Sequence, residues 1–217
     1  MTPPDPGPAG RAARDEPPHT AGRAARDERV ETSEHAGTSG TTSLGADWTV
    51  GEDGVRYRRA ARVVVLDGTG RVLVMRGHDR DQPERSWWFT VGGGIDAGET
   101  DVEAAVRELH EETGIVLSGA DLQGPVLTRS AMFHFLRESC RQDEVFFLAR
   151  VDGVGGTPDQ EGWTDTEREL LDELRWLTPA ELRAETREIY PENLADLVET
   201  WSAGWDGEVV HLGDSYE

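Results

Sequence analysis

The chain has 217 residues and a formal net charge of −21, and all 22 of its basic residues are arginine. Such acidity argues against non-specific binding to nucleic acid or to an anionic membrane, because both need a basic surface. No stretch is apolar for long enough to span a bilayer, and the N-terminal residues lack the apolar core of a signal peptide. We therefore expect a cytoplasmic protein. The single cysteine, Cys140, fits a reducing compartment because it cannot form an internal disulfide.

Residues 1–46 are rich in proline, glycine, alanine, threonine and charge, and they hold almost no large apolar side chain. A segment of this composition cannot bury a core, so we predict a disordered low-complexity tail. The stretch AGRAARDE occurs twice in it, at 9–16 and 21–28. Two copies are too few for a solenoid, which leaves a low-complexity duplication, with a binding arm as the alternative.

A folded domain is predicted over residues 56–201. The β-branched runs ARVVVLD and RVLVMRG flank Gly68-Thr69-Gly70, a pattern that predicts a β-hairpin. Further strands are expected in chain order at 87–91, 125–130, 132–136, 144–151 and 173–178. Thr178 and Pro179 are typical of a helix start, and a last helix is expected over 190–201. Residues 202–217 are expected to form a loose C-terminal end.

The central element is a predicted amphipathic helix between Thr100 and Thr113. Thr100 and Glu103 fit a capping box, and Gly114 can adopt the left-handed conformation that ends a helix. Apolar side chains recur at spacings of three and four, at Val102, Ala105, Val106 and Leu109. The pattern therefore predicts one apolar face that packs on a sheet.

Three carboxylates crowd the second half of this helix, at Glu108, Glu111 and Glu112. At about 100° per residue they fall on one face. Like charges at these spacings, and anions near the C-terminal end of a helix, each cost a few tenths of a kcal/mol. Helix stability alone therefore does not favour them. They are either a solvated acidic face or a set of ligands gathered for a cation.

The residues around these glutamates resemble a known motif. From Gly93 the chain reads glycine, five residues, Glu99, seven residues, and then RELHEETGI over 107–115. This matches every specified position of the Nudix box, Gx5Ex7REUxEExGU, in which U is a bulky aliphatic residue. The chain thus resembles the Nudix hydrolases. The resemblance implies an α/β fold, a Nudix-type α/β/α sandwich with a mixed central β-sheet, and hydrolysis of a nucleoside diphosphate linked to another group.

The resemblance also implies Mg²⁺ or Mn²⁺ as the cofactor. The main metal ligands of the family are the glutamates that match Glu108, Glu111 and Glu112. The glycine that matches Gly93 can add its carbonyl oxygen, and the arginine that matches Arg107 orients the carboxylates. The chemistry agrees, because hard divalent cations held by oxygen ligands neutralise a diphosphate and lower the pKa of a bound water.

Carboxylates near the box have two possible roles. Glu99 either ligates the metal or pairs with Arg107, and we favour the pairing. Glu144 is predicted to join the site as a metal ligand or general base, with nearby Asp143 as the second candidate and an ordinary loop charge as the alternative. A later group lies where some Nudix members bring a loop carboxylate to the metals, but it is expected to be solvated here: Glu167, Glu169, Asp172 and Glu173.

Candidate substrate-binding residues lie ahead of the box. Arg76, Arg80 and Arg85 surround the loop before the strand at 87–91, where guanidinium groups can bind phosphate. Trp87 offers a ring that can stack on a base. The alternatives are surface charge for the arginines and core packing for the tryptophan.

The substrate is expected to be a nucleotide or another small diphosphate, and not a nucleic acid. Sequence markers that some Nudix members carry for ADP-ribose, diadenosine polyphosphates, coenzyme A or NADH are missing here, so the sequence does not identify the substrate. A homodimer is a separate possibility that the sequence leaves open. The alternative function is a Nudix-fold ligand-binding or regulatory module without turnover. An isopentenyl diphosphate isomerase would need a cysteine ahead of the box, whereas Cys140 follows it.

Overall fold

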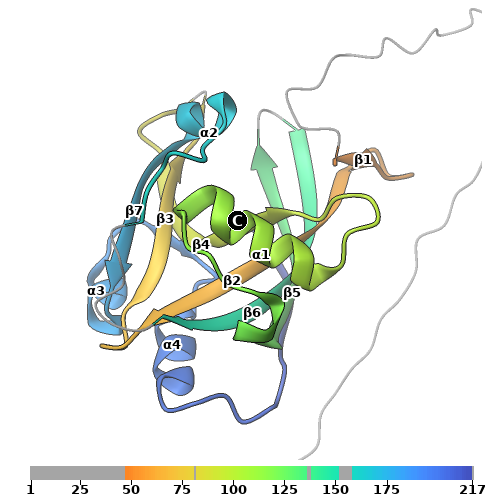
Figure 1. The fold of residues 1–217 in the computed structure, drawn as a ribbon. Coiled ribbons are helices and arrows are strands. Elements are labelled where there is room, and N and C mark those ends of the chain that lie inside the picture. The colour runs from red at the N-terminus through yellow and green to blue at the C-terminus, as the bar shows by residue number, and fades with distance from the viewer. Residues whose placement is uncertain (1–46, 81, 136–137, 152–157, 217) are drawn as a thin grey trace, which may run out of the picture. The chain divides into compact units, whose positions relative to one another are not determined.

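The computed structural model describes residues 47–216 apart from 81, 136–137 and 152–157, so the predicted tail at 1–46 lies outside the described residues. The described chain forms a nine-stranded sheet with the order β7-β3-β4-β2-β6-β5-β9, in which β1 adds to β2 and β8 adds to β4 (Figure 1). The strands are β1 (Thr49–Val50), β2 (Arg56–Asp67), β3 (Val72–His78), β4 (Ser86–Gly94), β5 (Leu122–Phe135), β6 (Glu138–Val151), β7 (Leu171–Leu177), β8 (Glu188–Tyr190) and β9 (Val210–Tyr216). The helices are α1 (Asp101–Thr113), α2 (Asp165–Leu170), α3 (Pro179–Ala184) and α4 (Leu194–Ser202), with a 3₁₀ turn η1 (Gly119–Asp121).

The sheet is mixed, as predicted. Strand β2 runs parallel to β6, β4 runs parallel to β8, and β5 runs parallel to β9. The remaining strand pairs are antiparallel. Helices cover both faces, which confirms the α/β/α sandwich. None of the helices in the described part of the chain is long and apolar enough to cross a membrane.

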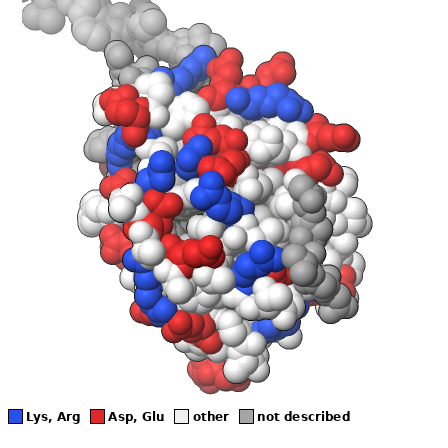
Figure 2. All heavy atoms as spheres, turned by 90° about the vertical axis from the view of Figure 1, so that its left-hand side faces the viewer, with Lys and Arg blue, Asp and Glu red and all other residues white. Residues whose placement is uncertain are grey.

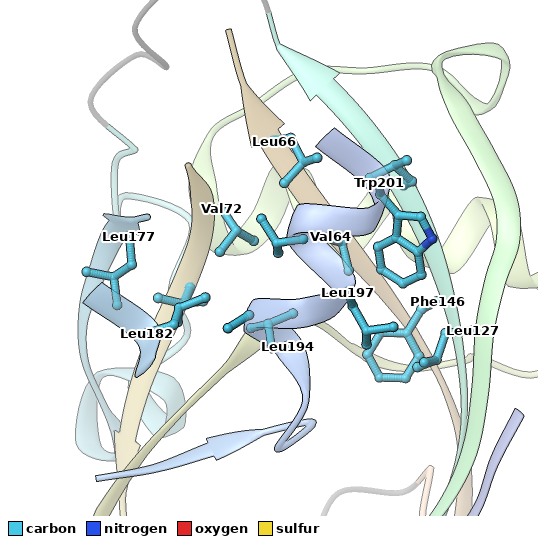
Figure 3. Packing of buried hydrophobic residues seen from close by; sticks show 14 of the residues in the cluster. Val64, Leu66, Val72, Leu127, Phe146, Leu177, Leu182, Leu194, Leu197 and Trp201 are labelled. Atoms are coloured by element: carbon cyan, nitrogen blue, oxygen red, sulfur yellow. The ribbon is translucent and has the colours of Figure 1, made fainter. Parts of the chain in front are cut away.

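Alternate residues of β2 build two separate cores. Val63 and Val65 pack with Leu109 of α1 in one apolar cluster. Val64 and Leu66 pack in another cluster with α4, whose Leu194, Leu197 and Trp201 are among the side chains drawn in Figure 3. Because side chains alternate across a strand, this pattern defines an α1 face and an α4 face of the sheet.

The predicted hairpin between β2 and β3 exists only at its turn. Leu66 opposite Val72 is the one register pair between these strands within the described residues. The Asp67 carboxylate accepts hydrogen bonds from the backbone amides of Thr69 and Arg71, which shapes the turn. Beyond the turn the strands diverge and β4 lies between them. The two strands predicted at 125–130 and 132–136 are likewise parts of one strand, β5, as far as Phe135, and residue 136 lies outside the described residues.

The prediction of a loose C-terminal end is wrong for Val210–Tyr216, which form β9 and pair in parallel with β5. Val210 and Leu212 pack against the α4-face core, and this burial gives the strand a reason to form. At the other end, the described fold starts before residue 56, because Trp48 packs edge-on against Phe133 with ring centroids 6.1 Å apart. The folded unit therefore extends beyond 56–201 on both sides.

Candidate active site

Helix α1 has the ends that its sequence predicts. The Thr100 hydroxyl accepts a hydrogen bond from the Glu103 amide at 3.2 Å, and Glu103 Oε2 accepts one from the Thr100 amide at 2.8 Å. Gly114 closes the helix with φ of 70°, in the left-handed region. Since Glu108, Glu111 and Glu112 lie on this helix, its caps help to fix the position of these three carboxylates.

Arg107 connects the carboxylates of the box. Its Nε and Nη2 donate to the two oxygens of Glu99, both at 2.9 Å, which confirms the predicted pairing. Its Nη1 donates to Glu108 Oε1 at 2.8 Å and to Glu111 Oε2 at 3.1 Å, and Nη2 also reaches the carbonyl of Gly94 at 2.9 Å. Hydrogen bonding from Arg107 lowers the pKa of Glu99. One guanidinium group therefore offsets much of the crowding on this face of the helix.

Glu108 is buried against the glycine-rich end of β4. Its residue is only 8% exposed, and burial raises the pKa of its carboxyl group despite the neighbouring Arg107. A Cβ atom on Gly93 would lie 2.7 Å from Glu108 Oε2. Glycine at this position is what allows the carboxylate to approach the backbone of β4 so closely.

Glu112 is fixed by a backbone amide of the same strand. The Gly92 N–H donates to Glu112 Oε2 at 2.7 Å, and the glutamate is 5% exposed. Gly92 has φ of 129°, and a Cβ atom there would clash with the carbonyl oxygen of Ala61. Glu111, in contrast, has a side chain that is 49% exposed and points to Arg107.

The segment before α2 packs on the C-terminal end of α1. The indole N–H of Trp163 donates to the carbonyl of Glu112 at 2.8 Å, and the Asp159 amide donates to the carbonyl of Thr113 at 3.1 Å. Trp163 is 5% exposed. These contacts satisfy carbonyl groups that a helix end leaves without partners. Sequence reasoning missed Trp163, because nothing in its local pattern links it to a helix fifty residues earlier.

Glu144 lies on the α4 face of the sheet in a buried ionic cluster. Its carboxylate contacts Arg62 and Arg129 and accepts a hydrogen bond from Gln142 Nε2 at 2.6 Å. Burial alone would raise its pKa, but the two guanidinium charges outweigh this and hold the pKa at about 2. A carboxylate with so low a pKa and three donors is a weak base, which does not favour the predicted role as general base. Asp143 bonds instead to Tyr57 and Ser130.

The predicted substrate-binding residues lie toward the opposite end of β4. Gly92 is five positions after Trp87, which is about 17 Å along a strand. Each arginine meets carboxylates: Arg76 meets Asp172 at 3.1 Å and Glu173 at 3.0 Å, Arg80 meets Glu169 at 3.0 Å, and Arg85 meets Glu188 at 3.5 Å. Figure 2, which shows the side of the molecule that carries β7 and α3, displays basic and acidic groups interspersed.

These contacts place the arginines in a surface network rather than in one cluster with the box. Arg85 stacks over Trp87 with 5.6 Å from its Cζ to the ring centroid. Trp88, not Trp87, is the fully buried ring, and its indole N–H donates to Glu185. The side chain of Glu167 lies outside the described residues.

The fold and the box together are those of enzymes that hydrolyse pyrophosphate bonds. A family model described as the NUDIX domain matches residues 56–197. The chain belongs to the Nudix family, and it is a diphosphohydrolase. The intact box and this membership do not support the alternative of a module without turnover.

Known relatives agree with this assignment. An uncharacterised Nudix hydrolase of Yersinia pestis is 31% identical over 140 residues, which cover 64% of this chain and 68% of the relative. An RNA pyrophosphohydrolase of Erythrobacter litoralis is 33% identical over 136 residues, covering 59% and 80% respectively. The crystal structure of a MutT protein from Methanosarcina mazei matches with a TM-score of 0.46 and 18% identity, covering 68% of this chain and 94% of that one.

Proposed function

We propose that this protein uses Mg²⁺ or Mn²⁺ to hydrolyse the phosphoanhydride bond of a nucleoside diphosphate linked to another group, or of a similar small diphosphate. The observation that carries the proposal is the burial of two box carboxylates, Glu108 and Glu112, against the glycine backbone of β4. Burying a carboxylate costs free energy, so carboxylates that only form a solvated helix face would be expected to stay exposed.

The donor chemistry fits a hard divalent cation. Glu108, Glu111 and Glu112 offer carboxylate oxygens and Gly93 offers a carbonyl, the ligand types that Mg²⁺ and Mn²⁺ prefer. In the part of the chain that the structure describes, no three acidic, histidine or cysteine side chains converge as a metal cluster. Arg107 holds Glu108 and Glu111, while Glu112 faces the amide of Gly92. When bound, the ion supplies charge neutralisation for the diphosphate and a water of lowered pKa.

The residues of this chain prepare the site in distinct ways. Arg107 orients two carboxylates, and the Gly92 amide orients the third. Trp163, which precedes α2, donates a hydrogen bond to the carbonyl of Glu112 in the last turn of α1. Glu144, with its charge already paired, contributes by positioning its arginine partners rather than by accepting a proton.

We further propose that Arg76, Arg80, Arg85 and Trp87 contact the part of the substrate remote from the hydrolysed bond. Trp87 lies roughly 17 Å along β4 from Gly92, and Arg76 pairs with Trp88 of the same strand, so these two residues lie away from a phosphate at the box. A guanidinium group can exchange its carboxylate partner for a phosphate, and the half-buried ring of Trp87 can stack on a base.

An RNA carrying a pyrophosphate is the second candidate substrate, because one relative is an RNA pyrophosphohydrolase. The net charge of −21 opposes an extended RNA path. The arginines at the outer end of β4 are each paired with carboxylates, which also opposes such a path. A small diphosphate therefore fits this chain better.

A substrate panel tests the proposal. The full chain is incubated with nucleoside diphosphate derivatives, nucleoside triphosphates and a 5′-triphosphorylated RNA, with Mg²⁺, with Mn²⁺ or with chelator, and the products are identified by mass spectrometry. We expect metal-dependent release of a nucleoside monophosphate from the small substrates, and turnover lower by orders of magnitude in the Glu112→Gln variant. Full activity in chelator, or orthophosphate released from simple monoesters, would contradict it.

A further inference from the structure

Arg62 lies on β2 directly opposite Gly92 of β4, yet it does not belong to the box. In the β2–β4 register the two residues are partners. Arg62 shares the α4 face with Val64, two residues further along the strand. Its side chain is 12% exposed. An arginine is thus buried under the strand end against which the box glutamates pack.

The guanidinium group of Arg62 bonds to the backbone of β4 at two points. Its Nη1 donates to the carbonyl of Thr90 at 3.0 Å and to the carbonyl of Gly92 at 2.9 Å. Its Nε donates to the carboxylate of Glu144. Glu144 is in turn held by Arg129 and Gln142. The carboxylate therefore anchors one edge of the guanidinium plane, and the other edge reaches β4.

The same glycine is bound from the opposite face by the box helix. The Gly92 amide donates to Glu112 Oε2, whereas the Gly92 carbonyl accepts from Arg62. Register pairs between β3 and β4 extend only from Ser86 to Thr90, so Gly92 lies beyond the part of β4 that β3 supports. Glu112 and Arg62 thus bond to a section of β4 that pairs with β2 but lies beyond its register pairs with β3.

We propose that Arg62 is a positioning residue of the active site. Held by Glu144, it binds the carbonyl groups of Thr90 and Gly92, which belong to the peptide groups before and after the one that carries the Gly92 amide, and this amide in turn fixes the carboxylate of Glu112. The inference rests on the proposed function, in which Glu112 is a metal ligand. It also assigns Glu144 its part, which is to hold Arg62.

Only arginine suits this place. A guanidinium group presents several N–H donors in one rigid plane, so it can bond to a carboxylate and to two carbonyl groups at once. A lysine has a single nitrogen, which the buried charge of Glu144 would attract away from Gly92. Arg62→Lys therefore keeps the positive charge that the cluster needs while it loses the bond to the strand.

Two readouts on the full chain test the proposal. The first is Mn²⁺ affinity, measured from the signal of free Mn²⁺ in electron paramagnetic resonance. The second is the hydrogen exchange rate of the Gly92 amide, measured by NMR without metal. We expect Arg62→Lys and Arg62→Met to weaken Mn²⁺ binding by roughly 10-fold or more, the usual effect of removing a group that orients a metal ligand. Both variants should also speed exchange at Gly92.

The control is Arg59, three residues earlier on β2. Its side chain is 55% exposed and pairs with Asp101 at the start of α1, so it touches the same helix without reaching Gly92. Arg59→Lys and Arg59→Met should leave both readouts unchanged. A general loosening of the contact between β2 and α1 would instead affect both pairs of variants.

The outcomes separate this inference from the proposed function. Wild-type protein that binds no Mn²⁺ contradicts the proposed metal site, while the metal-free exchange of Gly92 still tests the link to Arg62. Wild-type protein that binds Mn²⁺, together with an Arg62→Lys variant that keeps full affinity and slow Gly92 exchange, overturns the inference alone. If Arg62→Met does not fold, the Arg62→Lys variant decides the question, because it preserves the charge beside Glu144.

Discussion

Trp163 donates its indole N–H to the backbone carbonyl of Glu112 at 2.8 Å, and so joins the segment before α2 to the last turn of the box helix. A C-terminal carbonyl of a helix has no partner within the helix, and acidic side chains there meet the negative end of the helix dipole. The donated N–H opposes both effects. The carboxylates of Glu111 and Glu112 are therefore supported at a point where the helix by itself would favour basic residues.

Trp163→Phe should remove this hydrogen bond while it keeps most of the buried ring. We expect a loss of about 1 kcal/mol in the free energy of unfolding, measured with urea, because a net hydrogen bond has about that value. Hydrolysis should fall as well, because the turn that carries Glu112 is loosened.

Trp205→Phe is the matched control for this change. The Trp205 indole also donates to a backbone carbonyl, that of Glu208 at 2.8 Å, in the C-terminal segment away from α1. This variant should keep full hydrolysis. Equal losses of hydrolysis in both variants would show that Trp163 acts only through overall stability.

Gly92→Ala should mainly lower the stability of the fold, whereas Gly93→Ala should mainly lower metal-dependent hydrolysis. A Cβ on Gly92 meets the backbone of Ala61, and its φ of 129° is unfavourable for alanine, so we expect several kcal/mol of destabilisation. The atoms nearest to a Cβ on Gly93 belong to the carboxylate of Glu108, which can swing away. Gly93→Ala should therefore unfold cooperatively near the wild-type temperature and still lose metal-dependent hydrolysis.

Calorimetry and a hydrolysis assay on the same samples compare the two glycine variants. Gly98→Ala is a control in the same glycine-rich segment, because its Cβ meets no atom within 4 Å although its φ is 88°. It should lose some stability and keep activity. A fully active Gly93→Ala variant would show that the close approach of Glu108 is not needed.

Stability should also fall steeply in acid, because of Glu144. Its pKa is lowered from 4.5 to about 2 in the folded protein. In the pH interval between these values the unfolded chain binds a proton at Glu144 and the folded chain does not, so lowering the pH favours unfolding. The stabilisation is complete above about pH 4.5, is on the order of 3 kcal/mol, and disappears as the pH approaches 2.

Urea titrations between pH 6 and pH 2 measure this effect. Glu144→Gln should be less stable than wild type at neutral pH, because it leaves Arg62 and Arg129 buried without their counter-charge. Its stability should then depend less on pH between 4.5 and 2. A variant with the same slope as wild type in this interval would contradict the role of the ionic cluster.

The box helix could be predicted from sequence because its signals are local. Thr100, Glu103 and Gly114 define its ends through contacts with near neighbours. The pairing of Glu99 with Arg107 was also predictable, because it follows from the fixed spacing within the motif.

Long-range contacts could not be predicted in this way. The insertion of β4 between β2 and β3 depends on pairing partners rather than on turn residues, so a good hairpin turn misled the prediction. Strand β9 was missed because its apolar residues are few and are followed by Gly213 and Asp214, and only the packing of Val210 and Leu212 beside β5 explains the strand. The arginines around Glu144 come from two strands that flank β6, and a single sequence does not reveal that they meet.

The last prediction concerns the crowded glutamates themselves. Glu112→Gln keeps the shape of the side chain and an oxygen that can accept the Gly92 N–H, but it removes one negative charge from the face shared with Glu108 and Glu111. Without metal, the variant should be as stable as wild type or slightly more stable. With Mg²⁺ it should gain less in melting temperature, because an ion that binds the folded state stabilises it according to its affinity. Hydrolysis should fall by orders of magnitude, since stabilising the transition state of phosphoryl transfer depends on that ion.

Glu103→Gln is the control for this prediction. It lies on the same helix, removes the same charge, and keeps an oxygen that can accept from the amide of Thr100 in the capping box. This variant should retain most of its activity and the full response of its melting temperature to Mg²⁺. Thermal unfolding with and without Mg²⁺, followed by a hydrolysis assay, compares the two variants. Removing a metal ligand must weaken the metal site to which it belongs. If the melting temperature of Glu112→Gln responds to Mg²⁺ as that of wild type does, or if the variant keeps near wild-type turnover, then Glu112 binds no ion. The crowded carboxylates are in that case a solvated face of the helix.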